Sequence, residues 1–156
     1  MKKIKPFFLI IMIMVLFIAC SVFKRQNNVN SYKSDSGNPT IYKDGIYVGT
    51  SRSSYVSEPF WGKVSMIIKN GSFTSISFTI RDSALHETFD QHYEKHFQGN
   101  ELYIQQCRYD WKGVETYPKK LSIKQIPEKV DCISGATWSY NIFQASLKEA
   151  LKDAKE

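Results

Sequence analysis

The sequence lacks the signatures of several common functional sites. It has no Gly-rich phosphate-binding loop and no Gly-x-Ser-x-Gly turn of the kind that carries a hydrolase nucleophile. Its three cysteines match neither a zinc site nor a redox pair in their spacing. Lys and Arg are scattered rather than gathered in one stretch, which gives no indication of nucleic-acid binding. No internal repeat is present, and the 156 residues are enough for one domain.

The only long hydrophobic run is short for a membrane-spanning helix. It covers residues 7–19 and follows a start that carries Lys2, Lys3 and Lys5. A helix needs about 20 apolar residues to cross a bilayer, whereas the apolar part of a signal peptide has about 7–15. We therefore predict that residues 1–19 are a signal peptide. Its removal lowers the formal net charge from +6 to +3, because the three lysines are lost with it.

The hydrophobic run ends at a cysteine, in the order Leu-Phe-Ile-Ala-Cys. This ending resembles the lipobox of bacterial lipoproteins, in which a small residue precedes a cysteine that is lipidated and becomes the new N-terminus. Phe17 stands where that motif prefers leucine. The resemblance implies a lipid on Cys20 and a protein anchored to the cell membrane on its extracytoplasmic face. The alternative is an uncleaved anchor that continues through residues 21–23, which places the rest of the chain on the same side.

Residues 20–40 are polar and predict a flexible linker behind the lipid anchor. The folded domain is then residues 41–156. It contains two more cysteines, Cys107 and Cys132, which outside the cytoplasm can either pair or remain as two buried thiols.

The clearest local pattern in this domain predicts an antiparallel hairpin. Residues 62–82 alternate apolar with polar side chains around Asn70-Gly71, the strongest short turn signal for a hairpin. Asp44–Ser51 also has the composition of a strand and is expected to pair with the hairpin. From Ser139 onward the apolar residues recur at helical spacing and predict a C-terminal amphipathic helix. The fold class is therefore α+β, a small antiparallel sheet covered by helices.

The middle of the domain has weaker patterns. Residues 86–98 predict a helix or an ordered loop, residues 102–104 a short strand, and residues 117–126 a short helix stopped by a proline. His92 and His96 lie one turn apart if their segment is helical, so zinc is conceivable there. Isolated surface histidines are the alternative.

A polar turn precedes the C-terminal helix. Ser134 or Ser139 can cap that helix, which contributes about 1 kcal/mol. Gly135 and Ala136 are small, so an anion can approach the N–H groups that a helix leaves free at its start. Thr137 offers a hydroxyl at the positive end of the helix dipole. Threonine is a weak nucleophile unaided, so a phosphate ester at this position would need a separate enzyme.

The pattern Asp131-x-x-Ser134-Gly135-Ala136-Thr137, followed by an amphipathic helix, resembles the acceptor motif of the FMN-binding domain family. That family includes the flavin-carrying subunits of the sodium-pumping quinone reductase and of the Rnf complex, together with many small exported lipoproteins. Its motif threonine carries FMN through a phosphoester bond, which a flavin transferase makes from FAD with magnesium. The resemblance implies covalent FMN on Thr137 and extends over about residues 42–154.

The resemblance also implies roles for the neighbours of Thr137. The backbone from Ser134 to Thr137 would hold the phosphate, and the Ser134 side chain would bind the phosphate or cap the helix. Asp131 would pin the turn or serve the metal of the transferase. Trp138 or Tyr140 could stack on the isoalloxazine ring, and for each the alternative is an ordinary core or surface aromatic.

These residues predict a membrane-anchored, extracytoplasmic electron-transfer flavoprotein that carries FMN on Thr137. It would take electrons from a membrane dehydrogenase and pass them to an acceptor outside the cell, and it need not be an enzyme. One alternative is an exported flavin-dependent reductase with a substrate pocket beside the same flavin. Another is a binding lipoprotein without flavin, in which the Ser-Gly-Ala-Thr turn is only a helix cap.

Overall fold

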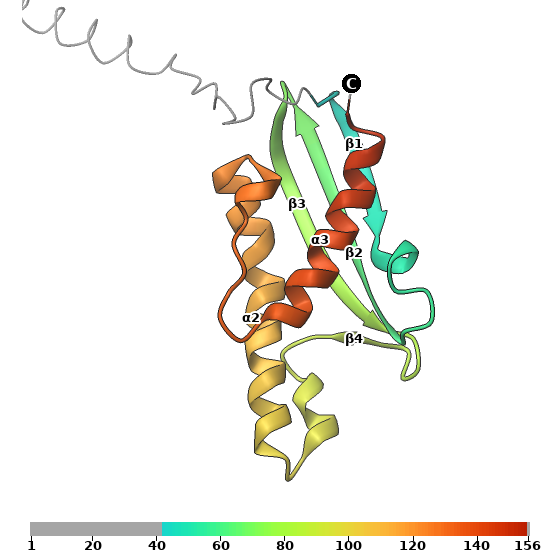
Figure 1. The fold of residues 1–156 in the computed structure, drawn as a ribbon, viewed down its shortest axis with the longest axis vertical. Coiled ribbons are helices and arrows are strands. Elements are labelled where there is room, and N and C mark those ends of the chain that lie inside the picture. Colours follow the sequence, from blue (N-terminus) through green and yellow to red (C-terminus); the bar gives the residue numbers. More distant parts are fainter. Residues whose placement is uncertain (1–41, 156) are drawn as a thin grey trace, which may run out of the picture. The chain divides into compact units, whose positions relative to one another are not determined.

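The computed structural model describes residues 42–155. The predicted signal peptide (1–19), the predicted lipidation site Cys20 and the predicted linker (20–40) lie outside the described residues. The predicted α+β class is confirmed: a four-stranded antiparallel sheet carries two α-helices (Figure 1). In chain order the elements are β1 (Gly45–Thr50), the 3₁₀ helix η1 (Ser51–Ser53), β2 (Phe60–Lys69), β3 (Ser72–Asp82), β4 (Glu87–Phe89), η2 (Tyr93–Phe97), α2 (Glu101–Lys124), η3 (Pro127–Lys129) and α3 (Thr137–Lys152).

The predicted hairpin is confirmed as β2 and β3. Asn70 and Gly71 both have positive φ, 51° and 69°, as a two-residue type I′ turn requires. The Asp44 carboxylate accepts hydrogen bonds from both of their amides, at 2.9 Å and 3.1 Å. A side chain just before β1 therefore fixes the turn between the next two strands.

One edge of the sheet is only partly paired. Among residues 42–155, β4 is the only strand on the outer side of β3, and it pairs only with Ile80–Asp82. At the other end of β3 the Gln125 side chain takes the place of a strand. Its amide oxygen accepts from the Phe73 N–H at 2.7 Å, and its amide nitrogen donates to the Phe73 carbonyl at 2.9 Å.

The two long helices lie against the same face of the sheet, α3 over β1 and β2 and α2 along β3 (Figure 1). Two glycines let α3 come close to the strands. A Cβ at Gly49 would collide with the backbone of Ala150, and one at Gly62 would collide with the Ile142 side chain. The helix is therefore seated directly on the sheet, which fixes where its first residue, Thr137, lies.

The sequence-based prediction for the middle of the domain was wrong. Residues 102–104 are not a strand, and residues 117–126 are not a separate short helix, because both belong mostly to the 24-residue helix α2. Gly113 and Pro118 lie inside this helix, and both residues argue against a helix interior. Leu102 and Ile123 are about four-fifths exposed, so apolar residues also lie on the solvent side of the helix and obscure its amphipathic pattern in the sequence. None of the helices in residues 42–155 combines the length and apolar character needed to cross a membrane.

Residues 86–98 form an ordered segment with β4 and η2. α3 begins at Thr137, two residues before the predicted start. The motif threonine is therefore the first residue of the helix rather than part of the loop before it.

Candidate functional site

Residues 131–136, the pre-α3 turn, run beside α2 before the chain enters α3 at Thr137 (Figure 1). Side chains from α2 hold this turn in place. The buried Tyr117 hydroxyl donates to the Ala136 carbonyl at 2.9 Å and accepts from the Ile133 N–H at 3.4 Å. The Gln106 side-chain amide donates to the Gly135 carbonyl at 2.8 Å. The turn is thus fixed by groups that lie 16 to 29 residues earlier in the chain.

A carboxylate on α2 caps α3. Asp110 is only 2% exposed, and its Oδ1 accepts from the Ser139 N–H at 3.0 Å. Its Oδ2 accepts from the Gln106 side-chain amide at 2.6 Å. The predicted caps do not form: Ser139 uses its hydroxyl to donate to the Ala136 carbonyl, and the N-cap residue is Ala136, which has no polar side chain. Ser134 lies exposed in the turn.

The first residues of α3 keep free donors. Within residues 42–155, the amides of Thr137 and Trp138 donate no hydrogen bond, because the Asp110 cap reaches only Ser139. The Thr137 side chain is exposed beside these two amides. Free N–H groups at the positive end of a 16-residue helix favour an anion. These residues therefore fit a phosphate ester on the Thr137 hydroxyl.

The small residues of the turn are explained by packing. Gly135 has a φ of +82°, and a Cβ there would lie 3.0 Å from the ring of Tyr109 on α2. Ala136 is fully buried where the two helices approach each other. On the opposite side of that contact, a Cβ at Gly113 would lie 2.6 Å from the Ser139 hydroxyl oxygen and 3.1 Å from the Ala136 Cβ. A larger residue at any of these positions would displace the turn.

Asp131 ties the start of the turn to the C-terminal half of α2. Its carboxylate contacts the Lys124 amine at 3.1 Å, and its carbonyl accepts from the Lys120 amine at 2.9 Å. The hydrogen bond from Lys124 holds the pKa of the Asp131 carboxyl below its usual value. Asp131 is exposed, so this contact is a surface ion pair of small energy whose main effect is to orient the loop.

Cys132 and Cys107 are free thiols. Cys107 is buried, as predicted for an unpaired cysteine, and burial raises its pKa. Cys132 is exposed, so the prediction of a buried thiol is wrong at this position. Its sulfur lies 3.8 Å from the Thr137 hydroxyl oxygen and 3.3 Å from the Ile133 carbonyl oxygen.

The aromatic residues that flank Thr137 in sequence are engaged with other rings. Trp138 is half-buried and meets Phe60 and Phe89 edge to face, with both ring centroids 5.2 Å away. Tyr140 packs edge to face on Tyr117 at 5.4 Å. Neither ring is free to turn toward Thr137 without giving up these contacts.

Sequence reasoning missed the α2 side of the site. Gln106, Tyr109, Asp110, Gly113 and Tyr117 all contact the pre-α3 turn or the first turn of α3. Gln106, Asp110, Gly113 and Tyr117 recur at intervals of four, three and four, which is the spacing of one helical face, and Tyr109 lies beside this row. That pattern could have been found only if the whole of α2 had first been identified as a helix.

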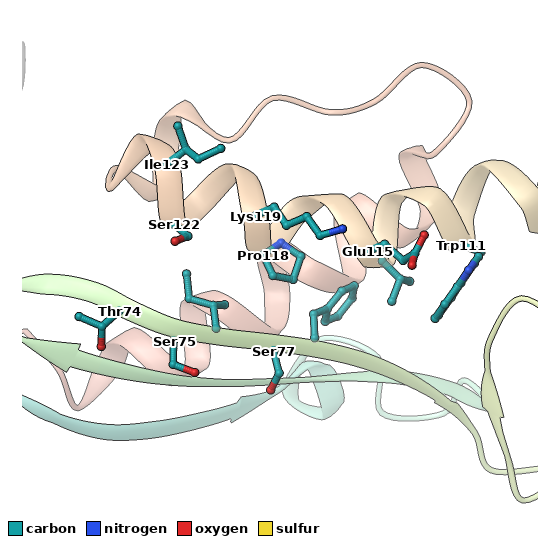
Figure 2. A pocket seen from close by; sticks show the side chains of 12 residues that line it. Thr74, Ser75, Ser77, Trp111, Glu115, Pro118, Lys119, Ser122 and Ile123 are labelled. Carbon is teal, nitrogen blue, oxygen red and sulfur yellow. The ribbon is translucent and has the colours of Figure 1, made fainter.

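A groove lies between β3 and another side of α2, with a volume of about 760 Å³ (Figure 2). Residues 74–78 of β3 form its floor, and Trp111, Glu115 and Pro118 lie along its helical wall. A smaller groove of about 420 Å³ lies between η3 and α3. Neither groove includes a residue of the pre-α3 turn.

His92, at the start of η2, and His96, within η2, make polar contacts near the surface. His96 contacts the Glu87 carboxylate at 2.9 Å, and His92 contacts the side chain of Gln91 at 3.1 Å. Residues 42–155 contain no cluster of three or more His, Cys, Asp or Glu side chains suited to a metal ion.

Comparison with known proteins gives two similarities. A family model described as FMN-binding domain matches residues 57–152, more than half of the chain, and this range includes the pre-α3 turn. The crystal structure of the CPE2226 protein from Clostridium perfringens is similar in fold, with a TM-score of 0.53 and 16% sequence identity, over 70% of this chain and 87% of that chain. At this identity the structural similarity is evidence for the fold alone. No curated protein matches the chain in sequence.

Proposed function

We propose, from the premise that this chain belongs to the FMN-binding domain family, that it is an electron-transfer flavoprotein with FMN joined to Thr137 through a phosphoester. Membership of the family makes the chain a flavin-binding protein. The covalent link, the electron-transfer role and the extracytoplasmic location are the proposal. The bound FMN would supply one- and two-electron chemistry, and the protein would set its position and exposure.

One observation carries the assignment of Thr137. Its hydroxyl is exposed at the first residue of α3, beside two backbone amides that no other residue in 42–155 occupies. A phosphate at the start of a helix is stabilised by about 0.3–1 kcal/mol at an exposed site. Ser134 is also exposed, but it lies before the helix and therefore farther from these amides.

Attachment at Thr137 requires a separate enzyme, because no base in the turn is placed to activate the hydroxyl. Among the described residues the only side chain within hydrogen-bonding distance of this hydroxyl is the Cys132 thiol, at 3.8 Å. An FAD-dependent, magnesium-requiring flavin transferase would form the bond between the Thr137 oxygen and the FMN phosphorus. The bond between the two phosphates of FAD would break, AMP would leave, and the hydroxyl proton would pass to the transferase.

The residues of α2 would keep the attachment point in one geometry. Tyr117 and Gln106 hold the carbonyls of Ala136 and Gly135, which turns the Thr137 amide and hydroxyl outward. Asp110 satisfies the third amide of α3 and leaves the first two free. In this arrangement the protein contributes position and a positive helix end rather than acid–base chemistry.

The exposure of Thr137 favours a carrier over a reductase with its own substrate pocket. Neither described groove reaches the pre-α3 turn, so a flavin attached there would be open to partner proteins. We further propose that residues 1–20 direct lipid anchoring at Cys20 on the extracytoplasmic face of the membrane. A membrane dehydrogenase would then supply electrons, and an acceptor outside the cell would receive them.

The test is the intact mass of the full chain after co-production with a flavin transferase and denaturation. We expect the added mass of FMN less water, with fragmentation placing it on Thr137. Thr137→Val keeps the branched shape but lacks the hydroxyl, so it is expected to fold and remain unmodified. Ser134→Ala is the matched control and is expected to be modified like the wild type. A wild-type chain without the added mass, or a modified Thr137→Val chain, contradicts the proposal.

The carrier role is tested on the modified protein. Electron exchange with many acceptors at rates that rise in proportion to their concentration is the expected result. Saturable turnover of one defined small acceptor would instead identify a reductase. The lipid anchor is tested by Cys20→Ala, which is expected to yield a chain without the mass of the attached lipid.

A further inference from the structure

The exposed side of α2 next to the pre-α3 turn carries a tyrosine, Tyr109. Tyr109 is 42% exposed, and its ring lies over Gly135, two residues before Thr137. We propose that Tyr109 is the surface against which the flavin ring rests once FMN is attached. This inference depends on the proposed attachment at Thr137.

The position of Tyr109 suits this role because its ring is held from two directions. The backbone of Gly135 lies against one part of the ring, close enough that a Cβ there would be 3.0 Å from the Tyr109 Cγ and Cδ2 atoms. Gln105 donates a hydrogen bond to the Tyr109 hydroxyl at 3.2 Å. A ring fixed in this way loses little freedom when a second aromatic system stacks on it.

The other aromatic residues near Thr137 are already paired within the protein. Trp138 packs against Phe60 and Phe89, and the fully buried Tyr117 packs against Tyr140. Of the aromatic side chains that contact the pre-α3 turn in the described structure, Tyr109 is the one with a large exposed area. It therefore replaces the predicted candidates Trp138 and Tyr140 as the stacking partner.

A second exposed apolar residue lies on the same side of α2. Leu102 is 80% exposed and precedes Tyr109 by seven residues, which is two helical turns or about 10 Å along the axis. An isoalloxazine ring that rests on Tyr109 and extends toward Leu102 would cover both. The two side chains, with Gln105 between them, thus give a narrow strip that begins beside the pre-α3 turn.

The attachment point lies within reach of this strip. Gly135 and Thr137 are two residues apart, so their Cα atoms are separated by at most about 7 Å. A phosphate and a ribityl chain separate the isoalloxazine ring from the threonine oxygen, and this spacer is long enough to place the ring over Tyr109. A ring against α2 keeps its opposite face open, as a carrier requires.

The test compares variants after each has been shown by mass to carry FMN. Tyrosine in contact with an excited flavin transfers an electron to it and quenches its fluorescence. We expect the wild-type flavin to be weakly fluorescent, and Tyr109→Leu, which keeps apolar bulk over Gly135 but lacks an aromatic ring, to be about 2- to 10-fold brighter. That range is the change in the unstacked, fluorescent fraction of the flavin that the loss of one aromatic contact of ordinary strength produces. Tyr109→Trp is expected to remain quenched.

Tyr103→Ala is the matched control. Tyr103 is also exposed on α2, but it stacks on Phe97 of η2 and does not contact the pre-α3 turn. Its removal is expected to leave the flavin fluorescence unchanged. Equal fluorescence of FMN-carrying Tyr109→Leu and wild type overturns the inference while attachment at Thr137 stands. A wild-type chain that takes up no FMN overturns both.

Discussion

Removing one oxygen atom from Tyr117 is expected to loosen the pre-α3 turn without changing the fold. In Tyr117→Phe the buried ring remains, and so do its contacts with Phe143 and Tyr140 at 5.5 Å and 5.4 Å. Only two hydrogen bonds are lost, one to the Ala136 carbonyl and one from the Ile133 N–H. The perturbation therefore isolates the link between α2 and the turn.

The loss of stability in Tyr117→Phe depends on which hydrogen bonds Ala136 and Ile133 retain. The Ala136 carbonyl still accepts from the Ser139 hydroxyl at 3.2 Å and from the Tyr140 N–H at 3.1 Å, so it is not left unpaired. The Ile133 bond is long at 3.4 Å, and Ile133 is half-buried, so its N–H can turn toward water. One good and one weak neutral hydrogen bond together contribute about 1–2 kcal/mol. For a domain of this size that corresponds to a fall in melting temperature of about 4–10 °C.

Urea unfolding of the two tyrosine variants measures this effect directly. Tyr140→Phe is the control, because the Tyr140 hydroxyl makes no hydrogen bond within residues 42–155 while its ring contacts Tyr117. We expect its free energy of unfolding to stay within about 0.5 kcal/mol of the wild type. We also expect Tyr117→Phe to be flavinylated more slowly, since the geometry around Thr137 is less fixed. Equal stability of the two variants would refute the reasoning that the Tyr117 hydroxyl holds the turn.

Three further outcomes are expected. In Gly113→Ala, a gain of about 1 kcal/mol in helix propensity is outweighed by contacts with the Ser139 hydroxyl oxygen at 2.6 Å and Tyr117 Cε2 at 2.8 Å. The net loss is about 1–2 kcal/mol by thermal unfolding, and a more stable variant would show that the helices are not in close contact there. Burial raises the pKa of Tyr117 to about 12, and burial with a hydrogen bond to a carboxylate raises that of Tyr93, whereas unfolded tyrosine ionises near pH 10. The contribution of these two hydroxyls to stability is therefore present in full below about pH 10 and falls between about pH 10 and 12. Urea midpoints that do not change over this range would contradict the burial of both hydroxyls. Asp44→Ala leaves two amides of the β2–β3 turn without their acceptor, so a lower urea midpoint is expected than for the exposed control Asp153→Ala.

The sequence was informative where the interactions are local. The Asn70-Gly71 pair predicts its own hairpin because few other residue pairs tolerate two successive positive φ angles. The apolar spacing of α3 predicts a helix because one of its faces is buried against the sheet. In both segments, the residues that determine the structure lie close together in the sequence.

The site was only partly predictable, because many of its contacts join residues that are distant in the sequence. The turn motif can be read locally, but the groups that hold it come from α2, and Gly113 and Pro118 conceal that helix in the sequence. Asp110 caps a helix that begins 27 residues later, so no local rule for a helix start includes it. Gly135 and Ala136 are small because Tyr109 and Gly113 approach them, and these contacts exist only in the folded chain.

The partly paired edge of β3 affects the tendency of this domain to aggregate at high protein concentration. Gln125 closes the edge at Phe73, and β4 closes it from Ile80 onward. Between them residues 74–79, which pair with β2 on their inner side, have no strand partner on their outer side among residues 42–155, so this edge is a template to which a strand from another copy can add. An irregular register between Ile67 and Ile68 of β2 twists this part of the sheet, and exposed hydroxyl side chains of β3 keep the edge hydrated. Solubility at high concentration therefore depends on a short stretch of serines and threonines, and replacing them with valine would favour aggregation by edge-to-edge strand pairing.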